Sequence, residues 1–395
     1  MRRPHLRDLL LGAALPLATA QQAEPMVECS HSCDSQGRCM PLRYIWGTRK
    51  AGTSTIYLML AAHSACGGNW RFGSRETQTT RGHPLSFMDA KESHYFTHIH
   101  GSASRDEYTA TYVTDDCLSR CFVDGTPANF MSHFAPAKLR SIMTNSEAVR
   151  ARFVVQLREP VARHVSYIKM EIREGRLSDS MDIFTSEQLF VWSNHMSNHR
   201  QQLSSIEYLL PRLRLCNERH GELAKPSCIV MGLQAAEIAS EMLAGCRILS
   251  YEGAGVNRSF SVAQGVPSAG TCTQFNYPHV IGRGLYASHL YNWLAQFSRP
   301  QLLLLNMHTN FESSASNDYY QNILDFLGIP ATIKLSDSTV PSAEVSPPSQ
   351  QDILSCRHRD ILLAEYDRWN QILYAMEPSF PRFPPATNVP CRAYG

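Results

Sequence analysis

The sequence has no large excess of either charge and no apolar run long enough to cross a membrane. Its 37 lysines and arginines against 35 acidic residues give a net charge of +2, so the overall charge indicates neither a nucleic-acid nor a membrane partner. The apolar stretch Leu9–Ala18 falls well short of the roughly 20 residues that a transmembrane helix needs. Any site for an anion must therefore be local.

Recognisable metal-binding signatures are also missing. No C-x-x-C pair among the 12 cysteines meets a second pair at zinc-finger spacing, so we expect disulfides and no metal centre. His98 and His100 stand two residues apart, without a carboxylate or a third histidine at a recognisable spacing. We interpret them as ordinary strand residues.

The N-terminus has the pattern of a secretory signal. MRRPHLRDLLLGAALPLATAQQ begins with basic residues, continues with an apolar run and ends in small residues, which predicts cleavage after Ala20. The alternative is a short uncleaved anchor, the only case in which we expect a membrane contact. The cysteines and the single N-glycosylation sequon at Asn257 agree with passage through the secretory pathway, to the Golgi lumen or out of the cell. Residues 1–20 are then the signal and residues 21–42 a cysteine-containing lead-in.

Residues 43–60, RYIWGTRKAGTSTIYLML, predict a strand, a loop and a helix. A loop bounded by Gly47 and Gly52 and leading into a helix presents backbone N–H groups and the positive end of the helix dipole, which suits a phosphate. The nucleotide-triphosphatase loop reads G-x-x-x-x-G-K-[ST]. Here Thr53 replaces its lysine and Lys50 lies inside the loop, which disfavours a kinase or an ATPase. An ordinary turn with solvated basic residues remains the alternative.

A second phosphate-binding pattern lies in residues 152–168, RFVVQLREPVARHVSYI. It predicts a buried strand of a parallel sheet, a turn at Arg158, and a helix that begins near Pro160. The arginine at the strand end and Ser166, two turns into the helix, converge on one side. A planar guanidinium and a hydroxyl together suit a phosphate.

Both segments resemble donor-binding motifs of sulfotransferases that use 3′-phosphoadenosine 5′-phosphosulfate (PAPS). The first resembles the 5′-phosphosulfate loop, and the second the 3′-phosphate motif L-R-[DE]-P-x-x-R-x-x-S-x-Y. The resemblance implies that PAPS is the co-substrate, that no metal is needed, and that Lys50 neutralises the leaving phosphate oxygen. Arg158 and Ser166 would bind the 3′-phosphate. The residues implied for the 5′-phosphosulfate are Arg49, Lys50, Gly52, Thr53, Ser54 and Thr55.

Residues 91–96, KESHYF, resemble the K-E-x-H-[FY]-F segment of heparan sulfate sulfotransferases, especially the 3-O branch, with the N-sulfotransferases nearby. The resemblance implies that Glu92 is the base that accepts the proton of a sugar hydroxyl, a role typically worth roughly 10²–10⁴ in rate. Lys91 and His94 would adjust its pKa and hold the acceptor. The alternative is a solvated Lys-Glu pair before a strand.

Three further segments bear on the resemblance. Residues 121–132, CFVDGTPANFMS, resemble V-E-K-T-P-x-Y-F-x-S, but Gly125 replaces a lysine that helps to hold the transferred group, so Lys50 and Lys91 are candidate substitutes. Residues 283–305 resemble R-[SG]-L-Y-x-x-x-L-x-x-W followed by a buried strand, so Arg283 is a candidate contact for an acidic acceptor. The later K-G-R segment of the family is missing from this sequence.

Taken together, the patterns predict an α/β, P-loop-like sulfotransferase fold over residues 43–395, with a mostly parallel central sheet flanked by helices. Residues 187–215 have helical spacing, the stretch that follows to 280 reads as irregular, and a probable insert lies around 210–280. The predicted activity is transfer of a sulfuryl group from PAPS to a sugar hydroxyl of a polysaccharide or proteoglycan. The alternatives are a protein-tyrosine sulfotransferase and a catalytically silent carbohydrate-binding relative.

Overall fold

The computed structural model describes residues 31–61, 92–93, 95–98, 102–110, 112, 123–173, 181–218, 226–244, 279–311, 316–329 and 353–393. The expected signal at residues 1–20 therefore lies outside the described residues, as do Lys91 and His94.

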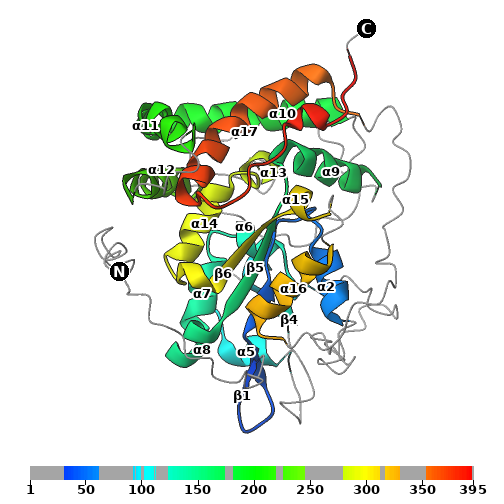
Figure 1. Ribbon diagram of the computed structural model, residues 1–395, viewed down its shortest axis with the longest axis vertical. Coiled ribbons are helices and arrows are strands. Elements are labelled where there is room, and N and C mark those ends of the chain that lie inside the picture. Colours follow the sequence, from blue (N-terminus) through cyan, green and yellow to red (C-terminus); the bar gives the residue numbers. More distant parts are fainter. Residues whose placement is uncertain are drawn as a thin grey trace.

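A four-stranded parallel sheet lies at the centre of the protein (Figure 1). Its strands are β3 (Arg43–Ile45), β4 (Val123–Asp124), β5 (Arg152–Leu157) and β6 (Leu302–Asn306). The spatial order is β4-β3-β5-β6, and each neighbouring pair is parallel. The predicted α/β fold with a parallel sheet is confirmed. Because the chain passes from β3 to β4 on one side and then returns to β5 on the other, the strand order reverses between β3 and β5. Open parallel sheets bind ligands outside the carboxyl ends of the strands at such a point.

Helices cover both faces of the sheet (Figure 1). On one face, Ile45 and Val154 pack with α2 (Thr53–Ala61) and α16 (Ser316–Leu327). On the other face, Tyr44 and Phe153 pack with the aromatic side chains of α14 (Tyr286–Leu294), of which Trp293 is fully buried. Neighbouring residues of each strand thus point to opposite faces, as the pleat of a strand requires. Short helices complete these layers: α6 (Ala128–Met131), α7 (Ala135–Ile142), α8 (Asn145–Arg150) and α15 (Met307–Phe311).

A block of helices lies beyond one end of the sheet (Figure 1). Its members are α9 (Pro160–Arg173), α10 (Met181–Asn198), α11 (Arg200–Glu218), α12 (Pro226–Ala244), α13 (His279–Gly282) and α17 (Cys356–Met376). Among the described helices, none has the length and apolarity that would let it cross a bilayer.

Helix α12 corrects the interpretation of residues 226–244 as irregular. The small residues that suggested a loop serve close packing between helices: Ala235, Ala236 and Ala239 are buried, and a Cβ on Gly232 would lie 2.8 Å from the backbone nitrogen of Met376 on α17. A disulfide between Cys216 and Cys228 joins α11 to the start of α12.

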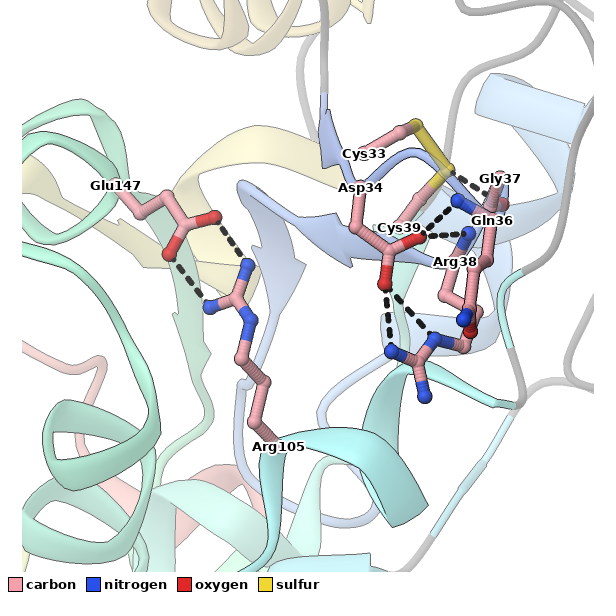
Figure 2. The surroundings of a disulfide bond; sticks show 8 residues. All are labelled: Cys33, Asp34, Gln36, Gly37, Arg38, Cys39, Arg105 and Glu147. Atoms are coloured by element: carbon pink, nitrogen blue, oxygen red, sulfur yellow. Dashed lines mark hydrogen bonds and ion pairs between the residues drawn. A yellow bond between two sulfur atoms is a disulfide. The ribbon is translucent and has the colours of Figure 1, made fainter.

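The described part of the lead-in is a tight hairpin closed by a disulfide. Strands β1 (His31–Cys33) and β2 (Cys39–Pro41) pair antiparallel, and Cys33 is bonded to Cys39. Figure 2 shows that the Asp34 carboxylate organises the turn, accepting bonds from the backbone N–H of Gln36 at 2.8 Å and from Arg38 Nε at 2.8 Å. The same view shows Arg105 of α5 (Arg105–Thr109) paired with Glu147 of α8 through contacts of 2.7 and 2.8 Å.

The segment around His98 is helical, so the interpretation of this residue as part of a strand is wrong. Residues Tyr95–His98 form the one-turn helix α4. Ser93 Oγ accepts the backbone N–H of Tyr95 at 3.4 Å, and Phe96 is buried against Trp46. A serine just before the first turn favours helix over strand because its hydroxyl satisfies a helix N–H that would otherwise lack a partner.

Candidate functional site

The loop after β3 lies in direct contact with β5. Backbone N–H groups of Trp46 and Thr48 donate to the carbonyls of Val154 at 3.0 Å and Gln156 at 2.9 Å. A Cβ at position 47 would lie 2.8 Å from the Gln156 nitrogen and 2.9 Å from its oxygen. Real Cβ atoms do not approach backbone this closely, so the loop needs Gly47 to remain paired with β5.

Two residues with positive φ then turn the loop into α2. Lys50 has φ 73° and Gly52 has φ 81°, and the N–H of Ala51 donates to the Thr48 carbonyl at 3.1 Å. A left-handed conformation at a residue other than glycine costs about 1 kcal/mol or more and concentrates at functional sites. Helix α2 begins at Thr53, so the hydroxyl-bearing residues 53–55 form its first turn, where the positive end of the helix dipole favours an anion.

Arg158, which follows β5, joins this loop to the second predicted motif. Its Nη1 donates to the Lys50 carbonyl at 3.0 Å, although the two residues are 108 positions apart in the chain. Burial lowers the pKa of Arg158, and within the described part of the protein its Nε has no hydrogen-bond partner. The sequence motifs expected at the two ends of one nucleotide therefore meet where the strand order reverses.

Glu159, the acidic neighbour of Arg158, accepts hydrogen bonds from the start of α9. The Glu159 carboxylate accepts the backbone N–H of Val161 at 2.9 Å and that of Ala162 at 2.6 Å. Burial raises its pKa, while these N–H groups and the nearby arginines lower it in part. Glu159 thus caps α9. Ser166 lies on the same helix, two turns further along, and is partly buried.

Further arginines gather around Tyr167, the residue after Ser166. The guanidinium carbons of Arg283 and Arg49 lie 4.9 Å and 5.8 Å from the centre of the Tyr167 ring. Removal from water lowers the pKa of Arg283 to about 10, and the positive charges of Arg49 and Arg163 act in the same direction. The sequence motifs placed Arg49, but they gave no role to Tyr167 or Arg163.

Arg163 is the most deeply buried member of this group. Its side chain is 0% exposed, and its Nη2 donates to the backbone carbonyl of Val280 at the α13 helix. Its Nε and Nη1 lack partners among the residues that the structure describes. Buried charge is costly unless it is paired, so this group of arginines is suited to an anionic occupant.

Glu92 reaches the same edge of the sheet through its neighbour Ser93. Ser93 Oγ donates to Asp124 Oδ2 at 3.0 Å, and Asp124 is the last residue of β4. The buried Asp124 carboxylate also accepts from the Tyr108 hydroxyl at 2.9 Å and from the Thr126 N–H at 2.9 Å. The partly buried Glu92 is therefore held at the carboxyl end of β4, the strand that pairs with β3. Gly125, which replaces the lysine of the resembling family, is buried directly after Asp124.

The arrangement combines an anion site with a nearby carboxylate. The loop after β3, the first turn of α2, Arg158 and the Tyr167 cluster supply N–H groups and positive charge, and Glu92 lies at the adjacent strand end. In the described ranges, no group of three or more histidine, cysteine or acidic side chains could hold a metal ion.

Comparison with known proteins adds little to this geometry. No protein-family model and no curated protein matches the sequence. Among solved structures, the chain is similar to a sulfotransferase from Alicyclobacillus acidocaldarius. The two are 15% identical, the match covers 85% of this chain and 95% of that chain, and the TM-score is 0.43. So loose a superposition supports no functional argument, and the conclusions below depend on the residues already described.

Proposed function

We propose that this chain is a PAPS-dependent sulfotransferase that transfers a sulfuryl group to a hydroxyl of a glycan. The observation that carries the proposal is the hydrogen bond from Arg158 to the Lys50 carbonyl. It joins a loop suited to a 5′-phosphosulfate and a motif suited to a 3′-phosphate at the place where a parallel sheet binds ligands.

The donor would lie across the ends of β3 and β5. The backbone N–H groups at the start of α2, together with Arg49, Lys50 and the hydroxyls of residues 53–55, would bind the 5′-phosphosulfate. Arg158 and Ser166 would bind the 3′-phosphate. Because these groups lie on strand ends and helix starts that are already packed, they are in place before the donor arrives, as efficient electrostatic stabilisation requires.

The reaction is an in-line displacement at sulfur. A sugar hydroxyl oxygen forms a bond to the sulfur as the bond between sulfur and the 5′-phosphate oxygen breaks, and the electron pair of that bond stays on the phosphate. Glu92 takes the hydroxyl proton, and Lys50 balances the negative charge that develops on the leaving oxygen. The products are the sulfated glycan and adenosine 3′,5′-bisphosphate.

The carbohydrate acceptor and the compartment are proposed on the sequence. The match of KESHYF to K-E-x-H-[FY]-F favours a polysaccharide or proteoglycan chain, with Lys91 and His94 assisting Glu92. The disulfides Cys33–Cys39, Cys216–Cys228 and Cys356–Cys391 suit an oxidising lumen. Together with the N-terminal pattern, they support the Golgi lumen or the cell exterior.

The test is an acceptor screen with radiolabelled PAPS, using the lumenal chain and a panel of glycans with a tyrosine-containing peptide as the rival acceptor. We expect label on a glycan. The Glu92→Gln variant should bind adenosine 3′,5′-bisphosphate within twofold of wild type and lose roughly 10²–10⁴ of its turnover. Glu207→Gln, at an exposed site on α11, is the matched control. Normal turnover in Glu92→Gln would exclude Glu92 as the base.

Gly125 favours one second candidate, a carbohydrate-binding relative that has lost catalysis. Without a lysine at this position, the transferred group has one cation fewer near β4. Calorimetry separates the two functions, because a silent binder with a decayed donor site should take up glycan but give no heat with PAPS.

A further inference from the structure

We propose that Arg283 is a second guanidinium ligand of the donor's 3′-phosphate, and not an acceptor contact. The inference depends on the proposed function and assigns a role within the same site. It also identifies a residue of this chain that could replace the missing K-G-R segment.

The turn that carries Arg283 is fixed against the start of α9. A Cβ on Gly284 would lie 2.4 Å from Cε1 of Tyr366 and 3.2 Å from Cβ of Pro160, so only glycine fits at this crossing. Two residues later, the Tyr286 hydroxyl donates to the carbonyl of Arg158 at 2.7 Å. The turn that carries Arg283 is therefore held against the backbone segment that carries Arg158.

The surroundings of the Arg283 side chain belong to the donor site. Its guanidinium lies over Tyr167 at 4.9 Å, and Tyr167 follows Ser166 in α9. Arg163 acts on the pKa of both Arg158 and Arg283, so it lies close enough to influence each of them. Arg283 thus packs against α9 at the residue next to Ser166 and close to Arg163.

The charges indicate what this group would bind. A phosphate monoester carries between one and two negative charges at neutral pH and offers three acceptor oxygens. Arg158 already uses one N–H on the Lys50 carbonyl, so a second guanidinium allows both charges of the phosphate to be met. A bound dianion would also relieve the repulsion among Arg49, Arg163 and Arg283 that contributes to the lowered pKa of Arg283.

A comparison of two nucleotides tests the role. Adenosine 3′,5′-bisphosphate and 5′-AMP differ only in the 3′-phosphate, so the ratio of their affinities measures what that phosphate contributes. We expect Arg283→Gln to reduce this ratio by about 10- to 100-fold, the usual effect of losing a hydrogen bond to a charged group, and to leave 5′-AMP affinity within twofold of wild type. Arg283→Lys should recover part of the ratio because it restores the charge.

A matched control separates this effect from the loss of an arginine stacked on a tyrosine. On the exposed surface of α11, Arg212 lies 4.8 Å from the centre of the Tyr208 ring, nearly the same geometry as Arg283 on Tyr167. Arg212→Gln should leave the affinity ratio unchanged. Thermal unfolding without ligand supplies the folding readout. The melting temperature of Arg283→Gln should stay close to that of wild type, because the lost contact with Tyr167 is offset by removal of a buried charge from beside Arg49 and Arg163.

The outcomes distinguish the two proposals. If wild type binds adenosine 3′,5′-bisphosphate no better than 5′-AMP, the proposed function fails. If wild type shows the preference but Arg283→Gln keeps it, or loses both nucleotides equally, the role of Arg283 is refuted. The role of Arg283 is supported if the ratio of the two nucleotide affinities falls in Arg283→Gln, stays unchanged in Arg212→Gln, and the melting temperature of Arg283→Gln is not reduced.

Discussion

Substitution of Gly47 by alanine tests whether the contact between the first loop and β5 creates the site. The added methyl would lie 2.8 Å from the Gln156 nitrogen, 2.9 Å from its oxygen and 2.7 Å from Cγ2 of Thr53. Two of these atoms are backbone in a central strand and cannot rotate away. The loop must therefore move from β5, which would lengthen the bond from the Thr48 N–H to Gln156 and the bond from Arg158 to the Lys50 carbonyl.

The expected loss of stability follows from these contacts. Overpacking of a well-packed position costs about 1–3 kcal/mol, and each of the two hydrogen bonds contributes about 1 kcal/mol net. Gly47→Ala should thus lower the free energy of unfolding by about 3–5 kcal/mol. Because the bond from Arg158 joins the two ends of the proposed donor site, binding of adenosine 3′,5′-bisphosphate should weaken as well.

Urea unfolding and calorimetry measure the two effects, with Gly328→Ala as the control. Gly328 ends α16 at φ +66°, and the nearest atom to its Cβ position is an Arg43 nitrogen at 3.6 Å. Its substitution therefore carries a conformational cost of about 1 kcal/mol without a clash, and nucleotide binding should not change. If Gly47→Ala unfolds within about 0.5 kcal/mol of wild type and binds the nucleotide normally, the loop is not held as described.

Three further substitutions probe stability at two buried titratable side chains and at one disulfide. Burial alone would raise the pKa of Glu147, but the pair with Arg105 lowers it to about 2 from 4.5. The stabilisation by this pair is therefore complete above pH 4.5 and is lost as the pH falls toward 2. Glu147→Gln should make stability less dependent on pH in that window, as measured by acid unfolding followed by circular dichroism. Burial lowers the pKa of His289 to about 4 from 6.5, so the unfolded chain binds a proton at this residue before the folded protein does. The free energy of unfolding, measured in urea, should therefore fall as the pH drops from 6.5 to about 4, and it should fall less steeply in His289→Gln. Replacing Cys356 and Cys391 by serine removes the disulfide between them and should lower the free energy of unfolding in urea by up to about 4 kcal/mol. An unchanged unfolding midpoint would contradict that disulfide.

The sequence predicted the framework of the site because its signals are local. An apolar strand, a glycine-bounded loop and a helical spacing lie within 18 consecutive residues around Lys50, and the segment around Arg158 is similarly compact. For such segments, burial and backbone geometry agree with the pattern. The parallel sheet and the start of α9 at Pro160 were predicted for this reason.

The parts that the sequence did not predict depend on contacts between distant segments. Alanine and glycine in α12 read as a loop because the helix they pack against, α17, lies more than a hundred residues later. Likewise, no local pattern shows that Arg163 is fully buried or that Arg283 and Arg49 share the ring of Tyr167. Partners of this kind are fixed by tertiary packing, which overrides local propensity.

The separation of Lys50 and Arg158 along the chain has a consequence for how the protein acquires its activity. Joining them closes a loop of 108 residues, at an entropic cost of about 4 kcal/mol. Neither half can form the proposed nucleotide site while the other is unfolded or still being synthesised. Competence to bind should accordingly appear late and all at once during refolding, and fragments divided between the two strands should bind only after they reassociate.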